Sequence, residues 1–479
     1  MDLFGIQPVI LVTDALLLLL LVIVVSYAWY ARRHEHLASP WKRLGKDSIA
    51  MGCLAFLLAY SMVGLADSVH FRLLLPNAEN SEENQSSSSK VYSAEVISLL
   101  DLALTRLRNQ DEKTYSAPFA THLFSKESIE QADGSMIRDY PRLEFGGAHL
   151  IDGQSKSNDI LKRSAIGLLF GLSGSLILLC LIGVRQSRKY SSNWRMSICS
   201  ILKRQTHSQW RAFWICSSIL ICISCILVQL CQVYHVFGTD KIGQDVLYQA
   251  LKSVRTGLLI GTLTTLIMLP FAILMGIAAG YFRGWMDDII QYIYTTLNSI
   301  PSVLLIASAV LMLQVYLNNN AEDYSSVLER ADMRLLFLCI ILGITSWTSL
   351  CRYLRAETLK LREMDYIAAA RSQGVGHATI ITRHILPNVM HIVLITVALD
   401  FSSLVLAEAV LAYVQIGVDP TTESWGNMIN SARLEMAREP IVWWSLSAAF
   451  VFMFALVLAA NLFADAIRNA LDPREQHND

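Results

Sequence analysis

The chain has 479 residues, of which 53% are hydrophobic and only 16% are charged, and its formal net charge is -1. The hydrophobic residues gather in runs of about 20, the length that crosses the hydrocarbon core of a bilayer. This composition excludes an ordinary soluble domain and predicts a polytopic membrane protein. We expect the lipid bilayer as its surroundings and no nucleic acid among its partners.

Nine of these runs are predicted to be transmembrane helices. No basic residue precedes the first run, which argues against a cleaved secretory signal, so we expect this helix to be retained. The expected limits of the nine spans are 9–30, 48–68, 164–184, 213–233, 255–280, 287–313, 335–351, 391–415 and 441–464.

The distribution of basic residues predicts the orientation in the membrane. Lys and Arg gather in segments 31–47, 185–212 and 352–390, which fall on one side when nine spans alternate. Short cytoplasmic loops carry the excess of Lys and Arg. We therefore expect a bacterial inner-membrane protein with a periplasmic N-terminus and a cytoplasmic tail, Arg468 to Asp479.

The region between the second and third spans, residues 69–163, is predicted to be a periplasmic loop or small lobe. It begins with Asn77 to Lys90, a low-complexity run whose composition is typical of a flexible tether. Helical spacing follows over Val91 to Asn109, and a folded lobe and a loosely ordered loop with one helix remain open. None of the nine cysteines lies in this region, so no disulfide framework is expected there.

The predicted spans divide the rest of the chain into three further regions. Residues 1–68 would hold two N-terminal transmembrane helices, residues 164–212 a third helix and a basic cytoplasmic loop, and residues 213–479 the main membrane domain.

A polar, helix-forming block interrupts the apolar spans in the main domain. It reads Asp365-Tyr366-Ile367-Ala368-Ala369-Ala370-Arg371-Ser372-Gln373-Gly374 and is followed by Ile385-Leu386-Pro387-Asn388. The alanines form a surface without bulk that can lie in a groove of another protein. Gly374 permits a turn into a second short helix, and Pro387 is expected to end that helix.

Other short motifs occur in series along the main domain. They are Gly238-Thr239-Asp240-Lys241-Ile242-Gly243-Gln244-Asp245, then Ser253 to Gly261 with Arg255, then Gly280 to Trp285 with Asp287 in a tight turn, then Trp347 through Arg352, Arg355 and Glu357, and last Ser424-Trp425-Gly426-Asn427-Met428.

Together these motifs resemble the permease subunits of ABC importers, in particular the C-type subunits of dipeptide, oligopeptide and nickel importers. The resemblance covers residues 213–479. It implies an all-α polytopic fold with a six-helix permease core, to which this chain adds about three N-terminal transmembrane helices and a small external lobe.

The resemblance also implies the function and the partners. The chain would form half of the translocation pathway for peptides or related solutes. Its partners would be a second, different permease subunit, two ATP-binding subunits and a periplasmic substrate-binding protein. The chain lacks the phosphate-binding sequence GxxxxGK[ST]. We therefore expect no enzyme activity, catalytic residue, cofactor or metal in this chain, with ATP and Mg bound by the partner ATPases.

Two sets of site residues follow from the resemblance. The periplasmic motif would comprise Gly238, Thr239, Asp240, Gly243 and Asp245. The coupling loop, residues 352–390, would contact the ATPases through its 365–387 part, namely Asp365, Tyr366, Ala368, Ala369, Ala370, Arg371, Gly374, Ile385, Leu386 and Pro387. This chain departs from the family pattern at Ala368, where a glutamate is usual, and at Gln244, where an arginine is usual.

Charged residues inside the spans suggest a third set. Asp400 and Glu408 are eight residues apart, which is roughly 80° around a helix, so they face different surroundings. We expect Asp400 to line the translocation path, while the family match around Glu408 points to a structural role near an outer gate, where Trp425 would also lie. Asp14 is expected to be exposed at the membrane interface.

Three histidines recur every seven residues in and just after the coupling loop, namely His377, His384 and His391. No carboxylate is suitably placed beside them, so we expect a surface role and not a metal site.

Two other functions remain open from the residues alone. In an ion-gradient-driven secondary transporter, Asp400 would be the ion site, but the sequence has no pair of Gly/Pro-broken spans of the inverted-repeat kind. In a membrane scaffold or receptor, the lobe at 69–163 would be the working part, and the series of core motifs argues against this.

Overall fold

The computed structural model describes residues 6–34, 41–74, 92–130, 136–150, 155–190, 193–203, 209–320, 322, 324 and 326–471. The predicted tether Asn77 to Lys90 and the tail beyond Leu471 lie outside the described residues. The chain divides into two units. Unit 1 comprises residues 1–15, 51–256 and 423–456, and unit 2 comprises residues 16–50, 257–422 and 457–479.

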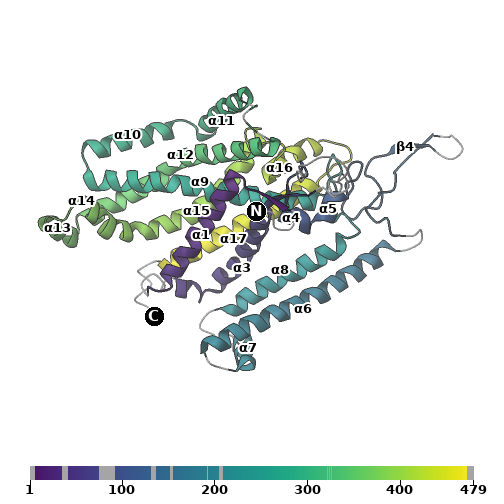
Figure 1. Ribbon diagram of the computed structural model, residues 1–479, viewed down its shortest axis with the longest axis horizontal. Coiled ribbons are helices and arrows are strands. Elements are labelled where there is room, and N and C mark those ends of the chain that lie inside the picture. The colour runs from purple at the N-terminus through teal and green to yellow at the C-terminus, as the bar shows by residue number, and fades with distance from the viewer. Residues whose placement is uncertain are drawn as a thin grey trace, which may run out of the picture. The chain divides into compact units, whose positions relative to one another are not determined.

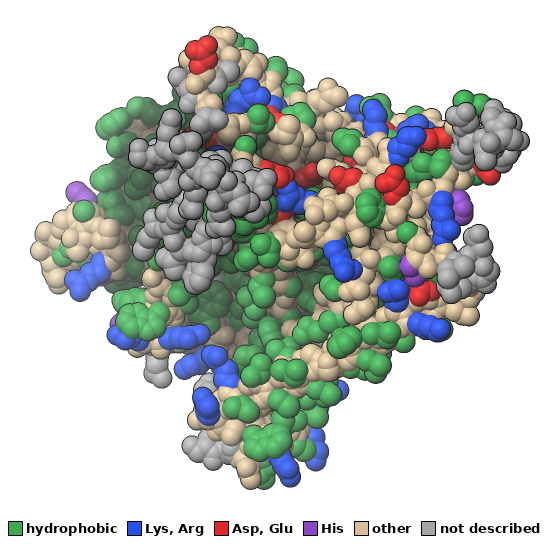
Figure 2. All heavy atoms as spheres, turned by 45° about the vertical axis from the view of Figure 1, so that its right-hand side comes forward, with side chains coloured by type: hydrophobic (Ala, Val, Ile, Leu, Met, Phe, Trp, Pro, Cys, Tyr) green, Lys and Arg blue, Asp and Glu red, His purple; other side chains and the backbone are tan. Residues whose placement is uncertain are grey.

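The described residues contain nine helices that are long and apolar enough to cross a membrane, which confirms the predicted number. Figure 2 shows broad areas of hydrophobic side chains on one face, as expected of surfaces that meet lipid. The nine, labelled in Figure 1, are α1 (Val12–Ala31), α3 (Ser48–Asp67), α6 (Lys156–Tyr190), α8 (Trp210–Leu230), α9 (Val246–Phe282), α11 (Ser302–Asn319), α12 (Val327–Arg362), α15 (Leu386–Tyr413) with the helical turns before it, and α17 (Trp444–Leu471).

The predicted sixth span, 287–313, is wrong in its limits. Two helices occupy this stretch, α10 (Trp285–Ser299) and α11, and only α11 has the length and hydrophobicity of a span. The break lies at Ile300, whose backbone is extended, with φ -91° and ψ 130°. Pro301 follows it, and the residue before a proline is driven out of the helical region by steric contact with the ring.

The lobe in unit 1 is folded over its described residues. Strand β1 (Ile6–Val9) pairs antiparallel with β2 (His70–Leu73), and β2 pairs with β3 (Ile97–Ser98). Two short helices follow, α4 (Leu99–Ala103) and α5 (Thr105–Asn109), and Ser98 and Asp101 form a capping box at the start of α4. A separate hairpin joins β4 (Glu127–Glu130) and β5 (Met136–Asp139). These strands and short helices are the described structure around region 69–163, and its assignment as a lobe stays a prediction.

Helices α6 and α8 form a close antiparallel pair in unit 1, with α7 (Trp194–Leu202) at the turn between them (Figure 1). Glycines on α6 allow the approach, since a Cβ at Gly171 would lie 2.6 Å from the Cα of Cys222 and one at Gly167 would lie 2.7 Å from the Cα of Ile226. All nine cysteines are free. Cys222 and Cys225 therefore lie at the contact between α6 and α8, where free thiols act as small apolar packing groups.

Unit 2 has its largest apolar core where α9 and α12 meet. A Cβ at Gly276 would lie 2.8 Å from the Cβ of Leu354, and one at Gly280 would lie 2.6 Å from the Cβ of Thr358, so the two helices touch through glycine. Tyr281 and Trp347 are buried in the same cluster. This core is the base on which the coupling loop is built.

Candidate functional sites

The polar block of the coupling loop forms helix α13 (Asp365–Ser372), which has one buried side and one exposed side. Ile367 and Ala370 are buried in the core of unit 2. The exposed side carries Asp365, Tyr366, Ala368, Ala369 and Arg371. Two adjacent alanines thus form a low surface without bulky side chains, flanked by an acid, a ring and a guanidinium.

The turn expected at Gly374 is present. Its φ is +74°, a conformation that L residues rarely adopt, and no atom lies within 4 Å of the position a Cβ would take. The amide of Gly374 donates to the carbonyl of Arg371 at 3.0 Å, and the amide of Val375 donates to that of Ala370 at 3.1 Å. Glycine is therefore required here by the backbone and not by packing.

The predicted break at Pro387 is wrong. After α14 (His377–Ile380) the helix continues through a π-helical turn, η3 (Ile381–Ile385), directly into α15. A proline ring clashes with the carbonyl four residues earlier in a regular helix, and a π turn widens the backbone at that point. Pro387 lies at the beginning of α15, which follows directly after this π turn. Ile385 is buried, whereas Leu386 is only partly buried.

Tyr281, which lies in the motif from Gly280 to Trp285 but is not among the predicted site residues, holds the coupling loop to its base. Its hydroxyl is 2.8 Å from Nδ1 of His377, and its carbonyl accepts a hydrogen bond of 2.9 Å from Arg362. The guanidinium of Arg371 lies over its ring, 5.1 Å from the centroid. His377 therefore has a structural partner, and no group of three or more metal-ligating side chains occurs among the described residues.

An ion pair fixes α10 to α12 in the same unit. Arg355 donates from Nε to Oδ1 of Asp287 at 2.6 Å and from Nη2 to Oδ2 at 2.7 Å, a bidentate geometry. The hydrogen bonds of Arg355 hold the pKa of Asp287 below its usual range. Both residues belong to motifs found in the sequence, but only the structure pairs them.

The three residues expected at a path or gate differ in their surroundings. Asp400 is half-buried on α15, and Glu408 is buried further along the same helix. Trp425, at the start of α16 (Trp425–Glu435), is buried in unit 1, where its Nε1 donates to the carbonyl of Ala250 at 3.1 Å. Their assignment to a path or gate stays a prediction.

The motif loop, residues 238–245, turns around Asp240. The Oδ1 atom of Asp240 accepts hydrogen bonds from the amides of Ile242, at 2.9 Å, and Gln244, at 3.0 Å. Gly238 and Gly243 adopt φ values of +71° and +89°. In place of the usual arginine, Gln244 bonds to Gln249 through its side chain at 3.2 Å.

An irregular segment of the lobe, residues 112–116, lies directly on the motif loop. Thr239 accepts from the amide of Ser116 at 2.7 Å and donates to the carbonyl of Thr114 at 2.9 Å. A Cβ at Gly243 would lie 1.6 Å from the carbonyl oxygen of Glu112, and a Cβ at Gly238 would lie 2.3 Å from that of Ser116. The lobe and the motif loop therefore pack directly against each other, too closely for a side chain at either glycine.

A buried histidine joins the same two segments. Nδ1 of His235 is 2.8 Å from Oδ2 of Asp245, and its Nε2 is 3.5 Å from Oε1 of Glu112. Glu112 also accepts backbone hydrogen bonds, from the amides of Glu144, Phe145 and Gly146. Burial lowers the pKa of His235, but hydrogen bonds to Asp245 and Glu112 outweigh it and raise the pKa to about 9. Burial raises the pKa of Glu112, but its hydrogen bonds with His235 and with the three backbone amides outweigh this effect and lower the pKa to about 2.

This cluster predicts a pH dependence of lobe stability. The folded pKa of His235 exceeds the unfolded value near 6.5, so its stabilisation is complete below about pH 6.5 and is lost as the pH rises through about 9. The protection factors of the amides at 144–146, which compare the observed exchange rate with the intrinsic rate at the same pH, should fall over that interval. A His235→Gln variant should have lower protection factors at pH 6.5, and they should change little up to pH 9. Equal pH dependence in both proteins would contradict the assignment.

The expected exposure of Asp14 is wrong. Its side chain is buried at 1% exposure, and its Oδ1 accepts hydrogen bonds from Nε of Arg255 at 3.0 Å and from Nη2 at 2.7 Å. Its Oδ2 lies 2.9 Å from Nδ1 of His70. A buried carboxylate is retained when it is paired in this way. The partners are far away in the sequence, so spacing gave no signal for them.

The family comparison covers the coupling loop, residues 352–390. The family model described as "Binding-protein-dependent transport system inner membrane component" matches residues 272–477. A stretch of 239 residues is 33% identical to the oligopeptide transport system permease protein OppC of Mycobacterium bovis and covers 50% of this chain and 76% of that protein. This chain belongs to that permease family.

Two further relatives show the same extent of similarity. The permease is 30% identical over 240 residues to the glutathione transport system permease protein GsiD of Pectobacterium atrosepticum, covering 50% of this chain and 73% of that protein. It is 28% identical over 240 residues to the dipeptide transport system permease protein DppC of Lactococcus lactis, covering 50% and 64%. Since the similarity is confined to one half of the permease, the other half is an N-terminal extension.

Family membership settles the broad class of the protein. The permease is a multi-pass inner-membrane protein and a transport subunit of a binding-protein-dependent ABC importer, without catalytic activity of its own. Such a component implies an ATPase and a substrate-binding protein as partners, and the family does not usually bind cofactors. The ion-driven carrier and the scaffold are therefore not retained as functions.

Proposed function

We propose that the permease forms half of the translocation pathway of a peptide importer and contacts ATP-hydrolysing subunits through α13. The relatives carry names of oligopeptide, dipeptide and glutathione systems, which supports peptides as the cargo. The exposed alanine side of α13, on a base fixed by Tyr281, is the observation that carries the docking role. A second, different permease subunit and two ATPases, which would hold ATP and Mg, complete the expected assembly.

A continuous helical run leads from the coupling loop to the residues proposed for the path and the gate. From α14 through η3 to the end of α15 the backbone is one helical run, His377 to Tyr413, and Asp400 and Glu408 lie on it. A displacement of α13 by the closing ATPases, passed on through the turn at Gly374, would reach these residues along this helical run. The Arg355 and Asp287 pair would carry the same displacement to α10. The cavity between two permease subunits would thereby change from inward-facing to outward-facing.

The proposal includes a direction across the membrane. The coupling loop would face the cytoplasm with the C-terminus, and the lobe, the motif loop and the N-terminus would face the periplasm. The basic segments 31–47, 185–212 and 352–390 support this orientation. The proposed domains remain residues 1–68, 69–163, 164–212 and 213–479.

Substitutions at Gly374 test the docking role without disturbing packing. Valine is strained at a φ of +74°, whereas asparagine tolerates that conformation, and the surrounding space is open to both. We expect Gly374→Val to lower ATP-driven peptide uptake about fivefold or more, as a strain of ~1 kcal/mol or more displaces α13. Gly374→Asn should retain most of the uptake. Equal uptake by both variants and the wild type would exclude a role for this turn.

The path assignment has its own test. Asp400→Ala removes the half-buried carboxylate on α15 and should lower uptake of cationic peptides more than that of neutral peptides, because a carboxylate at the path attracts a cationic cargo. Uptake is measured with radiolabelled peptides in cells that lack the wild-type permease. Asp419→Ala, beyond the end of α15, where the carboxylate is paired with Arg334, is the control. Wild-type uptake by Asp400→Ala would remove this residue from the path.

A further inference from the structure

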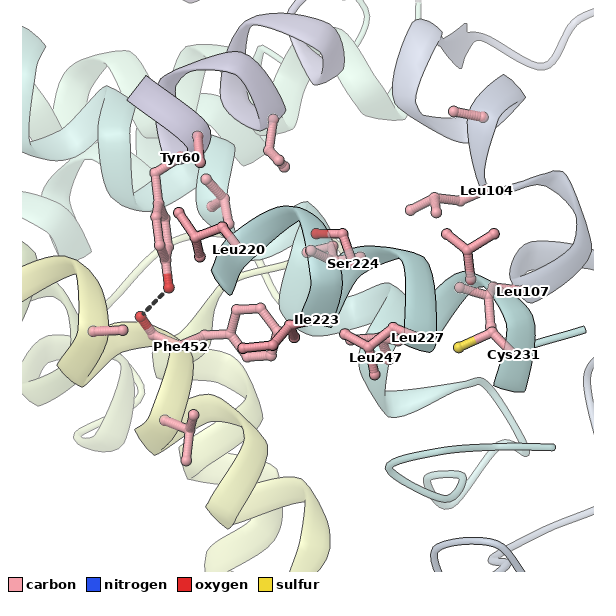
Figure 3. A pocket seen from close by; sticks show the side chains of 18 of the residues that line it. Tyr60, Leu104, Leu107, Leu220, Ile223, Ser224, Leu227, Cys231, Leu247 and Phe452 are labelled. Carbon is pink, nitrogen blue, oxygen red and sulfur yellow. Dashed lines mark hydrogen bonds between the residues drawn. The ribbon is translucent and has the colours of Figure 1, made fainter. Parts of the chain in front are cut away.

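A cavity of about 430 Å³ lies within unit 1 among four of the membrane-spanning helices (Figure 3). Helices α3, α8, α9 and α17 line it, and α4 and α5 of the lobe close one end. The labelled side chains in Figure 3 extend from Tyr60 and Phe452 at one end to Leu107 and Cys231 at the other. The cavity is thus elongated along α8.

Its walls are almost entirely hydrocarbon. Leu220, Ile223, Leu227 and Leu247 point into it. The hydroxyl of Tyr60 donates to the carbonyl of Phe452 at 2.9 Å and is therefore satisfied within the wall. Apolar cavities of ~150 Å³ stay dry and take up small hydrocarbons. This cavity is about three times larger, so it suits a long hydrocarbon chain and not water.

One end of the cavity carries a positive charge. Arg106 on α5 is among its lining residues and is exposed, and Gln232 lies beyond the end of α8 at the same end. Basic side chains at the edge of a membrane attract anionic lipid head groups, and a guanidinium binds phosphate with two parallel hydrogen bonds. A cavity with apolar walls and a cation at one end is complementary to an anionic phospholipid, whose acyl chain is apolar and whose head group carries a negative charge.

We infer that this cavity binds one acyl chain of an anionic phospholipid whose phosphate contacts Arg106. The occupant is available because the lining helices are long and apolar enough to cross a membrane, and Ile223, which lines the cavity, is 50% exposed. Peptide cargo does not fit the site, since among the described residues that line it Arg106 is the one charged side chain and none is a carboxylate that could bind an amino terminus. The lipid would fill space between the added helix α3, the lobe and α9 of the permease.

The test is native mass spectrometry of the full-length permease, purified in mild detergent and incubated with phosphatidylglycerol or phosphatidylcholine vesicles. Wild type should retain one phosphatidylglycerol that Ile223→Trp loses, because the indole occupies the cavity. Leu181→Trp, at a 63% exposed position on α6 outside the cavity, is the matched control and should retain it.

The charge is tested separately. Arg106→Gln should reduce the preference for phosphatidylglycerol over phosphatidylcholine about fivefold, the factor expected for one basic side chain near an anionic surface. Arg138→Gln, on β5, should leave it unchanged. This pair of variants leaves the cavity intact, so the proposal stays testable if the tryptophan variant does not fold. Retention of the lipid by Ile223→Trp, an unchanged preference in Arg106→Gln, or a protein chain or peptide as the bound species would overturn it.

Discussion

Ala369→Trp will lower ATP-driven peptide uptake by the assembled transporter about tenfold or more. Ala369 lies on the exposed side of α13, next to Ala368, and a tryptophan there would hold a partner away from a surface that is otherwise low. Overpacking of a fitted contact costs typically ~1–3 kcal/mol, and every ~1.4 kcal/mol is tenfold in affinity. Uptake of labelled peptide and recovery of ATPase subunits with the tagged permease should fall together.

The matched control is Ala148→Trp. Ala148 is exposed in the lobe, so this variant adds the same ring to a surface that the proposed docking does not use. We expect its uptake and its ATPase recovery to match the wild type. If Ala369→Trp also behaved as wild type, the alanine side of α13 would not be a docking surface.

Glu112→Ala will release the lobe from the motif loop. The substitution removes the acceptor of three backbone amides and leaves the charged His235 with one buried carboxylate partner in place of two. Removing one member of a buried ion pair costs typically ~3–5 kcal/mol. We expect the opening free energy of the lobe, measured by hydrogen exchange at residues 112–116 and 238–245, to fall by about that amount.

Glu127→Ala is the control for this substitution. Glu127 pairs with Lys113 at 2.5 Å, but that lysine is 70% exposed, and exposed ion pairs contribute about 0–1 kcal/mol. Protection of the same amides should change little. Equal losses in both variants would mean that the Glu112 and His235 contact does not hold the lobe.

The sequence predicted the membrane spans well because each span is a local property. Runs of apolar residues identify a helix that crosses lipid wherever it lies, so nine spans were expected and nine are found among the described residues. The two errors in helix limits both lie at a proline. At Pro301 the sequence predicts one continuous span where the structure has two helices, and at Pro387 it predicts a helix end where the structure has a continuous helical run.

The contacts that build the sites were harder to predict. Gly374 and the alanine block carry a conformational signal within a few residues, so the turn and the exposed surface could be anticipated. The pairing of Asp14 with Arg255 joins residues 241 positions apart, and the Glu112 contact to His235 joins the lobe to the permease core. No periodicity within a span contains such information, because these contacts depend on the tertiary fold.

The proposed contact between α13 and an ATP-hydrolysing subunit can be tested by photocrosslinking. A photoactivatable benzophenone amino acid is placed at position 369, and at position 148 as control, and membranes that contain the assembled transporter are irradiated. We expect an adduct between position 369 and an ATP-binding subunit and none from position 148. An ATPase adduct at position 148, or none at position 369 in a transporter that hydrolyses ATP, would contradict it.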